Sequence, residues 1–170
     1  MQKRKRLIVL IGRRYSGKET LISVAQEFFC GETTVGVVQS NLFLPAFQKI
    51  ARKSIAVCER EIRETLGRYD IVFFNAVCFP EELPMVFSFS PGCYITVVYV
   101  DAKVENRLHS ERTNKHVIGG SSAFMKDAIT EAHISELAIW ANANCVLENN
   151  GTLDEYKNRC LSFFMREILF

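Results

Sequence analysis

The chain has 170 residues, of which 48% are hydrophobic, 24% charged and 11% aromatic, and its formal net charge is +2. This length and composition are typical of one folded domain, residues 1–170, and exclude global disorder. The longest apolar runs, residues 7–11 and 137–141, fall far short of the ~18–20 residues of a membrane-spanning helix. The first run is also too short for a signal-peptide core. We therefore expect a cytoplasmic protein with no membrane partner.

Basic residues are concentrated at the N-terminus. Seven of the 21 lysines and arginines lie in the first 18 positions, which contain no acid, and residues 1–6 form a basic segment. Such a segment can be a nuclear address, a contact for RNA or for a protein assembly, or a solvated tail before the first strand. The sequence leaves these alternatives open.

The six cysteines and three histidines show no zinc-ligand spacing. Several cysteines, such as Cys145, have apolar neighbours in the sequence. We therefore expect reduced, buried thiols.

Five short apolar segments alternate with helical patterns along the chain. The segments that predict strands are residues 7–11, 35–38, 71–74, 94–100 and 145–148. Helical spacing is found at residues 17–29, at 45–66 in two pieces ended by Gly67, and at 124–141, while residues 80–84 start a short helix or turn. This alternation predicts an α/β fold with a parallel sheet covered by helices on both faces. Ligands bind such a sheet outside the carboxyl ends of its strands.

The last helix has its own start signal. Thr152 and Glu155 have the spacing of a capping box, in which each side chain binds the other residue's backbone amide. The apolar face of the helix that follows is predicted to contain Leu153, Tyr156, Cys160, Phe163 and Phe164.

A glycine-rich segment joins the first predicted strand to the first helix. It reads Gly12-Arg13-Arg14-Tyr15-Ser16-Gly17-Lys18 and matches the P-loop pattern G-x-x-x-x-G-K. The glycines let the backbone amides of residues 13–18 turn inward, the helix N-terminus adds partial positive charge, and Lys18 adds a full charge. A strand before the segment and a helix after it predict a phosphate-binding loop.

The position after Lys18 departs from the usual pattern. Glu19 stands where a serine or threonine hydroxyl normally binds Mg²⁺, and Thr20 follows it. These two residues are about 100° apart around the helix, so Thr20 cannot simply replace the missing hydroxyl. The Glu19 carboxylate can bind Mg²⁺, or can repel phosphate where no metal is bound.

The segment Ser16-Gly17-Lys18-Glu19-Thr20 resembles the acidic P-loop variant of deoxynucleoside monophosphate kinases. Phosphomevalonate kinases and adenylate-kinase-like proteins carry similar variants, and dephospho-CoA kinase belongs to the same group of P-loop small-molecule kinases. Three further segments, residues 73–82, 98–112 and 141–155, are similar to the group's third strand, its fourth strand with an arginine-bearing lid, and its closing Asn-x-Gly-Thr-Leu pattern.

The resemblance implies a three-layer P-loop NTPase fold with five parallel strands, and transfer of the ATP γ-phosphoryl group to a small, (deoxy)nucleotide-like acceptor. It implies that Lys18, with Arg107 and Arg112 from a lid at about residues 103–122, contacts the transferring phosphates. Asn150 and Gly151, with Asn149, would lie near the nucleotide base or form a plain turn. Mg²⁺ would be held by Glu19 or Thr20, with Asn75 acting through water.

Two departures from this resemblance fall at functional positions. Asn75 stands where the group usually has an aspartate, and Cys78 where an arginine binds the acceptor phosphate. Glu81 or Glu82 can replace the lost acid or belong to the first turn of a helix. The candidates for binding the acceptor phosphate, or for surface pairs with Glu59, Glu61 and Glu64, are Arg52, Lys53, Arg60 and Arg63.

Two functions therefore remain. The first is an active ATP-dependent kinase with rearranged ligands for the metal and the acceptor. The second is a catalytically degenerate P-loop protein that serves as a nucleotide-binding or structural subunit of a larger protein or ribonucleoprotein assembly.

Overall fold

The computed structural model describes residues 4–13, 15–31, 33–39, 48–75, 82–107 and 141–169, with the backbone alone at 48–54. Residues 124–140 of the helix predicted at 124–141 lie outside these residues, as does the part of the candidate lid beyond residue 107. The individual predicted residues outside the described part are Arg14, Cys78, Glu81 and Arg112, together with the side chains of Arg52 and Lys53.

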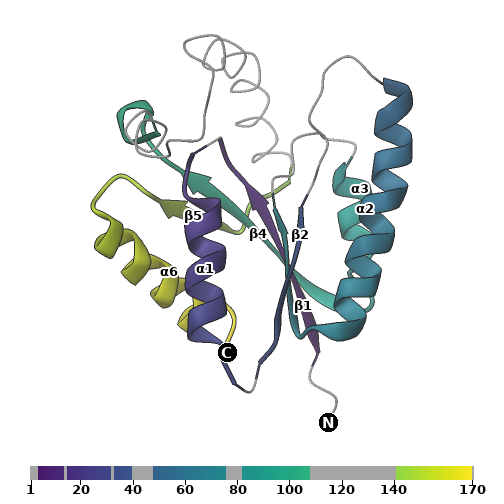
Figure 1. Cartoon of the computed structure of the whole chain (residues 1–170), viewed down its shortest axis with the longest axis horizontal. Coiled ribbons are helices and arrows are strands. Elements are labelled where there is room, and N and C mark those ends of the chain that lie inside the picture. Colours follow the sequence, from purple (N-terminus) through teal and green to yellow (C-terminus); the bar gives the residue numbers. More distant parts are fainter. Residues whose placement is uncertain are drawn as a thin grey trace.

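The core of the fold is a five-stranded parallel sheet. Its strands are β1 (Lys5–Ile11), β2 (Val35–Gln39), β3 (Ile71–Asn75), β4 (Cys93–Asp101) and β5 (Cys145–Glu148). They lie in the order β2-β3-β1-β4-β5, so the first strand is central and the chain crosses over it (Figure 1). Because all five strands are parallel, their carboxyl ends share one edge of the sheet, which is where the loop after β1 lies.

Helices cover both faces of the sheet (Figure 1). On one face, α1 (Lys18–Phe28) and α6 (Leu153–Glu167) pack on Ile8 and Leu10 of β1; on the other, α2 (Gln48–Arg68) and α3 (Glu82–Phe87) pack on Leu7 and Val9. Successive β1 residues thus face opposite layers, as the period of a strand requires. The predicted three-layer α/β fold is confirmed. No helix within the described residues is long and apolar enough to cross a membrane.

Three of the sequence-based predictions are wrong in detail. The second helix is continuous from Gln48 to Arg68, so Gly67 does not end it and it is not split within this range. A single glycine costs a helix only about 1 kcal/mol, and burial of Cys58 and Ile62 against the sheet outweighs that cost.

The second wrong prediction placed Leu153 on the apolar face of the last helix. Leu153 is 58% exposed, because it is the first residue of α6 and precedes the face that packs on the sheet.

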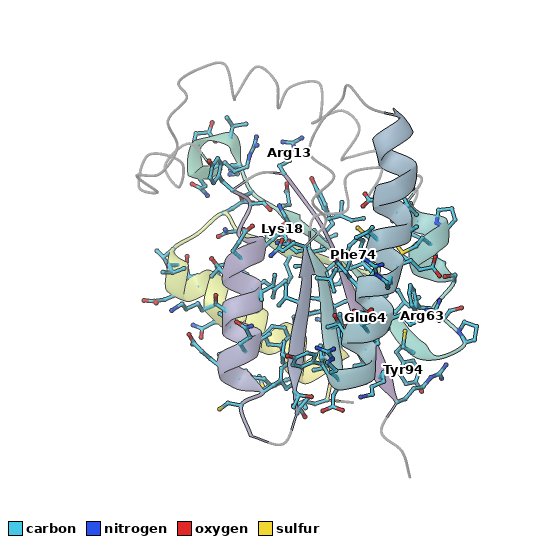
Figure 2. The ribbon with its side chains drawn as sticks, turned by 45° about the vertical axis from the view of Figure 1, so that its right-hand side comes forward. Arg13, Lys18, Arg63, Glu64, Phe74 and Tyr94 are labelled. Carbon is cyan, nitrogen blue, oxygen red and sulfur yellow. The ribbon has the colours of Figure 1, made fainter. Side chains whose placement is uncertain are left out.

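The third correction concerns the basic N-terminal segment, which overlaps β1 because that strand begins at Lys5. The guanidinium groups of Arg4 and Arg6 lie 4.1 and 5.3 Å from the ring centroid of Tyr94. Arg6 donates to the Glu167 carbonyl at 3.0 Å, and Lys5 donates to the carbonyl of Tyr69, directly after α2, at 3.0 Å. These bases therefore bind carbonyl groups at helix C-termini, where cations are favoured. Tyr94 lies at the end of the sheet opposite Lys18 (Figure 2).

The described cysteines are free thiols, and four of the five are buried. Burial raises the pKa of Cys58 and Cys160 to about 11, so both thiols stay protonated at neutral pH. The prediction of reduced, buried thiols is confirmed for these four, whereas Cys30 is exposed.

The predicted capping box at the start of α6 is confirmed. Thr152 N donates to Glu155 Oε2 at 2.7 Å, and Glu155 N donates to Thr152 Oγ1 at 3.3 Å. The hydrogen bonds from Thr152 hold the pKa of Glu155 below its usual value. The charged carboxylate therefore stabilises the fold above the unfolded-state pKa, and this contribution is lost as the pH falls through the folded-state pKa.

We predict that Glu155→Gln lowers the free energy of unfolding at pH 7, because a neutral amide accepts the Thr152 N–H bond less strongly than a carboxylate. The difference from wild type should vanish at acidic pH, where Glu155 is protonated in both states. Urea denaturation across this pH range measures it, with Asp154→Asn in the same helical turn as the control. A difference of equal size at acidic pH would contradict the assignment.

Candidate phosphate-binding site

The loop between β1 and α1 has a backbone that depends on glycine. Gly12 and Gly17 have φ angles of +156° and +108°, and Tyr15 between them has φ +60°. A Cβ atom at Gly12 would lie 2.6 Å from the Val100 carbonyl oxygen, so the chain passes directly against β4 at this point. The loop therefore turns tightly at the carboxyl edge of the sheet, and both glycines of the sequence motif are needed for its shape.

Lys18 folds back over this loop. Its side chain is 4% exposed, and Nζ donates to the carbonyl oxygens of Gly12 at 2.8 Å and Arg13 at 2.7 Å. Ser16 Oγ lies 3.5 Å from the same nitrogen. Figure 2 places Lys18 at the end of the strands, below Arg13. The ammonium group is thus held against the loop by the carbonyl groups of the loop itself.

The N-terminus of α1 carries no side-chain cap. Its N-cap residue is Gly17, whose carbonyl accepts the Leu21 amide at 3.0 Å. Glu19 is exposed and Thr20 is half-buried in the first turn, whereas Ser16 is fully buried. A helix N-terminus of this kind attracts anions through its amide groups and its dipole.

The remaining residues of the predicted loop are placed as follows. Arg13 and Tyr15 are half-buried, and the Arg13 carbonyl also accepts the Ser16 amide at 3.2 Å. Arg14 lies outside the described residues.

Two residues from the far end of the sequence hold the loop, a role that the sequence did not reveal for either of them. Asn149 Nδ2 donates to the Ser16 carbonyl at 2.9 Å, and the Tyr156 hydroxyl donates to the Gly17 carbonyl at 3.1 Å. The one available signal was a tyrosine on the predicted apolar face of the last helix, because a buried hydroxyl needs a partner.

The Asn149–Gly151 turn, predicted to lie near a nucleotide base, is at the same edge of the sheet. Asn150 Oδ1 accepts the Lys103 amide at 2.8 Å, and Asn106 Nδ2 donates to the Asn149 carbonyl at 3.3 Å. Gly151 is exposed. The turn therefore links the end of β5 to the segment that follows β4.

Arg107 lies in that segment and is 1% exposed. Its amide donates to the Lys103 carbonyl at 3.1 Å, which places it in a helical turn just beyond the carboxyl end of β4. The sheet thus brings Lys18 and Arg107 to one edge, whereas Arg112 lies outside the described residues.

Asn75 is the last residue of β3 and is paired in register with Leu10 of β1 and Gln39 of β2. It is 2% exposed, and its Nδ2 donates to Gln39 Oε1 at 2.9 Å. Within the described part of the chain, Asn75 Oδ1 has no hydrogen-bond donor. A buried acceptor without a donor carries a desolvation cost of about 1–3 kcal/mol, which a ligand or bound water would remove.

Of the four basic residues predicted to bind the acceptor phosphate, the structure describes the side chains of Arg60 and Arg63. Arg63 forms an exposed ion pair with Glu59 at 2.8 Å. Of the two predictions for this residue, the structure therefore has the surface pair. Arg60 is exposed. Glu82, by contrast, is fully buried at the start of α3, and its charge helps to raise the pKa of Cys58.

The residues predicted to hold a metal offer oxygen donors only. In the described ranges, no group of three or more His, Cys, Asp and Glu side chains could form a complete metal site. Mg²⁺ does not require such a group, since it keeps several waters and is bound by one or two protein oxygens together with substrate phosphates. The Oδ1 of Asn75, which has no donor among the residues that the structure describes, and the carboxylate of Glu19 fit that role.

No family model and no curated protein matches the chain. Solved structures do match. Shikimate kinase from Acinetobacter baumannii in complex with shikimate has a TM-score of 0.64 at 15% identity, over 99% of this chain and 97% of that one. The APS kinase of Mycobacterium tuberculosis in complex with AMPPNP and APS has a TM-score of 0.64 at 12% identity, over 95% and 98%. A gluconokinase from Sinorhizobium meliloti 1021 has a TM-score of 0.60 at 15% identity, over 97% and 94%.

These likenesses establish the fold, which is that of P-loop small-molecule kinases. The more specific resemblance to deoxynucleoside monophosphate kinases stays a prediction.

The close contact at Gly17 gives a test of the loop. A Cβ atom there would lie 2.5 Å from Asn149 Nδ2 and 2.9 Å from Tyr156 Cε1. Gly31 has a similar φ of +113°, but nothing lies within 4 Å of its Cβ position. We predict that Gly17→Ala lowers the free energy of unfolding by at least about 2 kcal/mol and Gly31→Ala by about 1 kcal/mol. Equal losses in urea denaturation would contradict the observed packing.

Proposed function

We propose that the protein binds ATP through the loop from Gly12 to Thr20 and transfers its γ-phosphoryl group to a small, nucleotide-like acceptor. The observation that carries this proposal is the buried Lys18 ammonium, held over a positive-φ glycine loop at an uncapped helix N-terminus. The P-loop kinase fold supports it, because this loop occupies the edge of the sheet where such folds bind ligands.

Each part of the loop has a distinct task in this proposal. Lys18 exchanges its bonds to the Gly12 and Arg13 carbonyls for the β- and γ-phosphate oxygens, which are stronger partners because they are charged. The loop amides and the first turn of α1 bind the remaining phosphate oxygens. Arg107, at the same edge, neutralises charge that develops during transfer. Phosphoryl transfer depends on position and charge neutralisation, and these groups contribute to both.

Mg²⁺ would be held by Glu19 or Thr20, with Asn75 Oδ1 accepting a hydrogen bond from one of its waters. When bound there, the ion would supply positive charge that offsets the negative charge of the phosphates.

The amide at the end of β3 favours a phosphorylated acceptor. An alcohol must lose a proton as it attacks, and the neutral amide of Asn75 cannot take that proton. A phosphate monoester is already largely ionised at neutral pH, because its second pKa is about 6. In this reaction an acceptor phosphate oxygen bonds to the γ-phosphorus, the bond to the β-phosphate oxygen breaks, and ADP leaves, with no proton transfer required.

A second function is favoured by the same amide and by Glu19. A nucleotide-binding or structural subunit that retains the fold but lacks catalysis needs neither a carboxylate at β3 nor a hydroxyl after Lys18. The basic residues Arg4, Lys5 and Arg6, at the opposite end of the sheet, would then exchange their present contacts for a protein or RNA partner.

We predict that Lys18→Ala weakens Mg-ATP binding at least about tenfold, or about 1.4 kcal/mol, because it removes a full positive charge from the loop. Titration calorimetry measures the affinity, and thermal melting verifies that the variant is folded. Lys18→Met retains the length of the side chain and should show the same loss, whereas Lys157→Ala on α6 should bind like wild type. Unchanged affinity in folded Lys18 variants would overturn the phosphate-site assignment.

We also predict that Asn75→Asp leaves ATP affinity within about twofold of wild type and raises the phosphotransfer rate about tenfold or more. A carboxylate at the end of β3 would hold the metal waters more strongly, and Gln39 can rotate its amide to donate to it. Coupled measurement of ADP release gives the rate, with Asn158→Asp on α6 as the control. A fall in rate would show that the amide of Asn75 has a role of its own.

A further inference from the structure

The phosphate loop is fixed by two hydrogen bonds from the C-terminal part of the chain. The donors are Asn149 Nδ2, just after β5, and the Tyr156 hydroxyl, in the first turn of α6. They bind the carbonyls of Ser16 and Gly17, the two residues directly before Lys18. Both bonds are made to carbonyl groups of the loop, so neither occupies one of its amide groups.

The Tyr156 bond is built to persist. Tyr156 is 1% exposed, and burial, together with the nearby Cys160 and Glu19, raises the pKa of its hydroxyl. The hydroxyl is therefore protonated, and able to donate, throughout the physiological pH range. Its position in α6 is fixed by the capping box at Thr152, one turn earlier in the chain.

The loop needs such support because its backbone is strained. Tyr15, a non-glycine residue at φ +60°, lies in a sparsely populated conformation that persists only when the surroundings hold it, whereas Gly17 adopts its φ of +108° without strain because it has no Cβ atom. The absence of a side chain at Gly17 lets Asn149 and Tyr156 approach within contact distance of it.

Asn149 also connects the loop to the segment that carries Arg107. The backbone amide of Asn149 donates to the Asp101 carbonyl at 2.7 Å, and its backbone carbonyl accepts from Asn106 Nδ2 at 3.3 Å. Asn106 directly precedes Arg107, while Asn150 binds the Lys103 amide in the same segment. One residue therefore contacts the loop that holds Lys18 and the turn that holds Arg107.

We infer that Tyr156 and Asn149 are positioning residues that hold the loop in its phosphate-binding conformation and fix its place relative to Arg107. This inference rests on the proposed function of the loop. When the loop loses a bond, the fraction of molecules in the binding conformation falls, and the apparent affinity for phosphate falls in proportion. Affinity for the nucleoside part of a ligand is not affected by this mechanism.

The test is Tyr156→Phe, which removes one hydroxyl and keeps the ring that packs in the core. Titration calorimetry with tripolyphosphate and with Mg-ATP should show about fivefold weaker binding, the effect of one lost hydrogen bond. Adenosine, measured in parallel, should bind wild type and variant equally. Tyr69→Phe, which removes a hydroxyl at the opposite end of the sheet, should bind all three ligands like wild type. Asn149→Ala should weaken tripolyphosphate binding by about fivefold or more.

Hydrogen exchange of the unliganded protein separates the two proposals. Amides of residues 15–19 should exchange faster in Tyr156→Phe than in wild type and Tyr69→Phe, because the bond from Tyr156 holds the loop even without ligand. If wild type binds tripolyphosphate and the Tyr156 and Asn149 variants bind it equally well, the positioning role is wrong and the phosphate site stands. If wild type binds neither tripolyphosphate nor ATP, both proposals fail, whatever the exchange rates.

Discussion

A lysine ammonium group that is almost completely buried needs partners, and this requirement governs the geometry of the site. A charge without partners inside a protein is costly, and here the Gly12 and Arg13 carbonyls lie within 2.8 Å of Lys18 Nζ. They can do so only because the loop turns through positive-φ positions at the end of β1. The glycines, the turn of the loop and the burial of the lysine therefore depend on one another.

The parallel sheet places this unit in contact with groups from distant parts of the chain. Because β1 is central, its carboxyl end has β3 on one side and β4 on the other. Asn75 thus lies on the β3 side of the loop, and Arg107 with the Asn149–Gly151 turn follows strands on the other side. In the proposed reaction, this arrangement separates the end of β3, where an amide favours an ionised acceptor, from the side where Arg107 neutralises phosphate charge.

The sequence was sufficient to predict the fold class, the strands and the glycine loop, since each depends on local patterns of a few residues. Alternating apolar strands and helices predicted a parallel sheet covered on both faces, whereas the order of its strands, with β1 at the centre, was not predicted. The continuity of α2 through Gly67 was not predictable, because packing on the sheet outweighed a local stop signal. The contacts of Asn149 and Tyr156 with the loop were also missed, because they join residues 133 and 139 positions apart.

The most direct measurement of the central claim is ADP release from Mg-ATP by the wild-type protein across a panel of acceptors. The panel contains nucleoside monophosphates, dephospho-coenzyme A and phosphomevalonate, with shikimate and gluconate as acceptors that must lose a hydroxyl proton. We expect turnover that depends on a phosphorylated acceptor, is absent with the two hydroxyl acceptors, and is abolished in Lys18→Ala. Folded wild-type protein that binds Mg-ATP and releases no ADP with any acceptor would contradict a kinase and identify the site as one for binding alone.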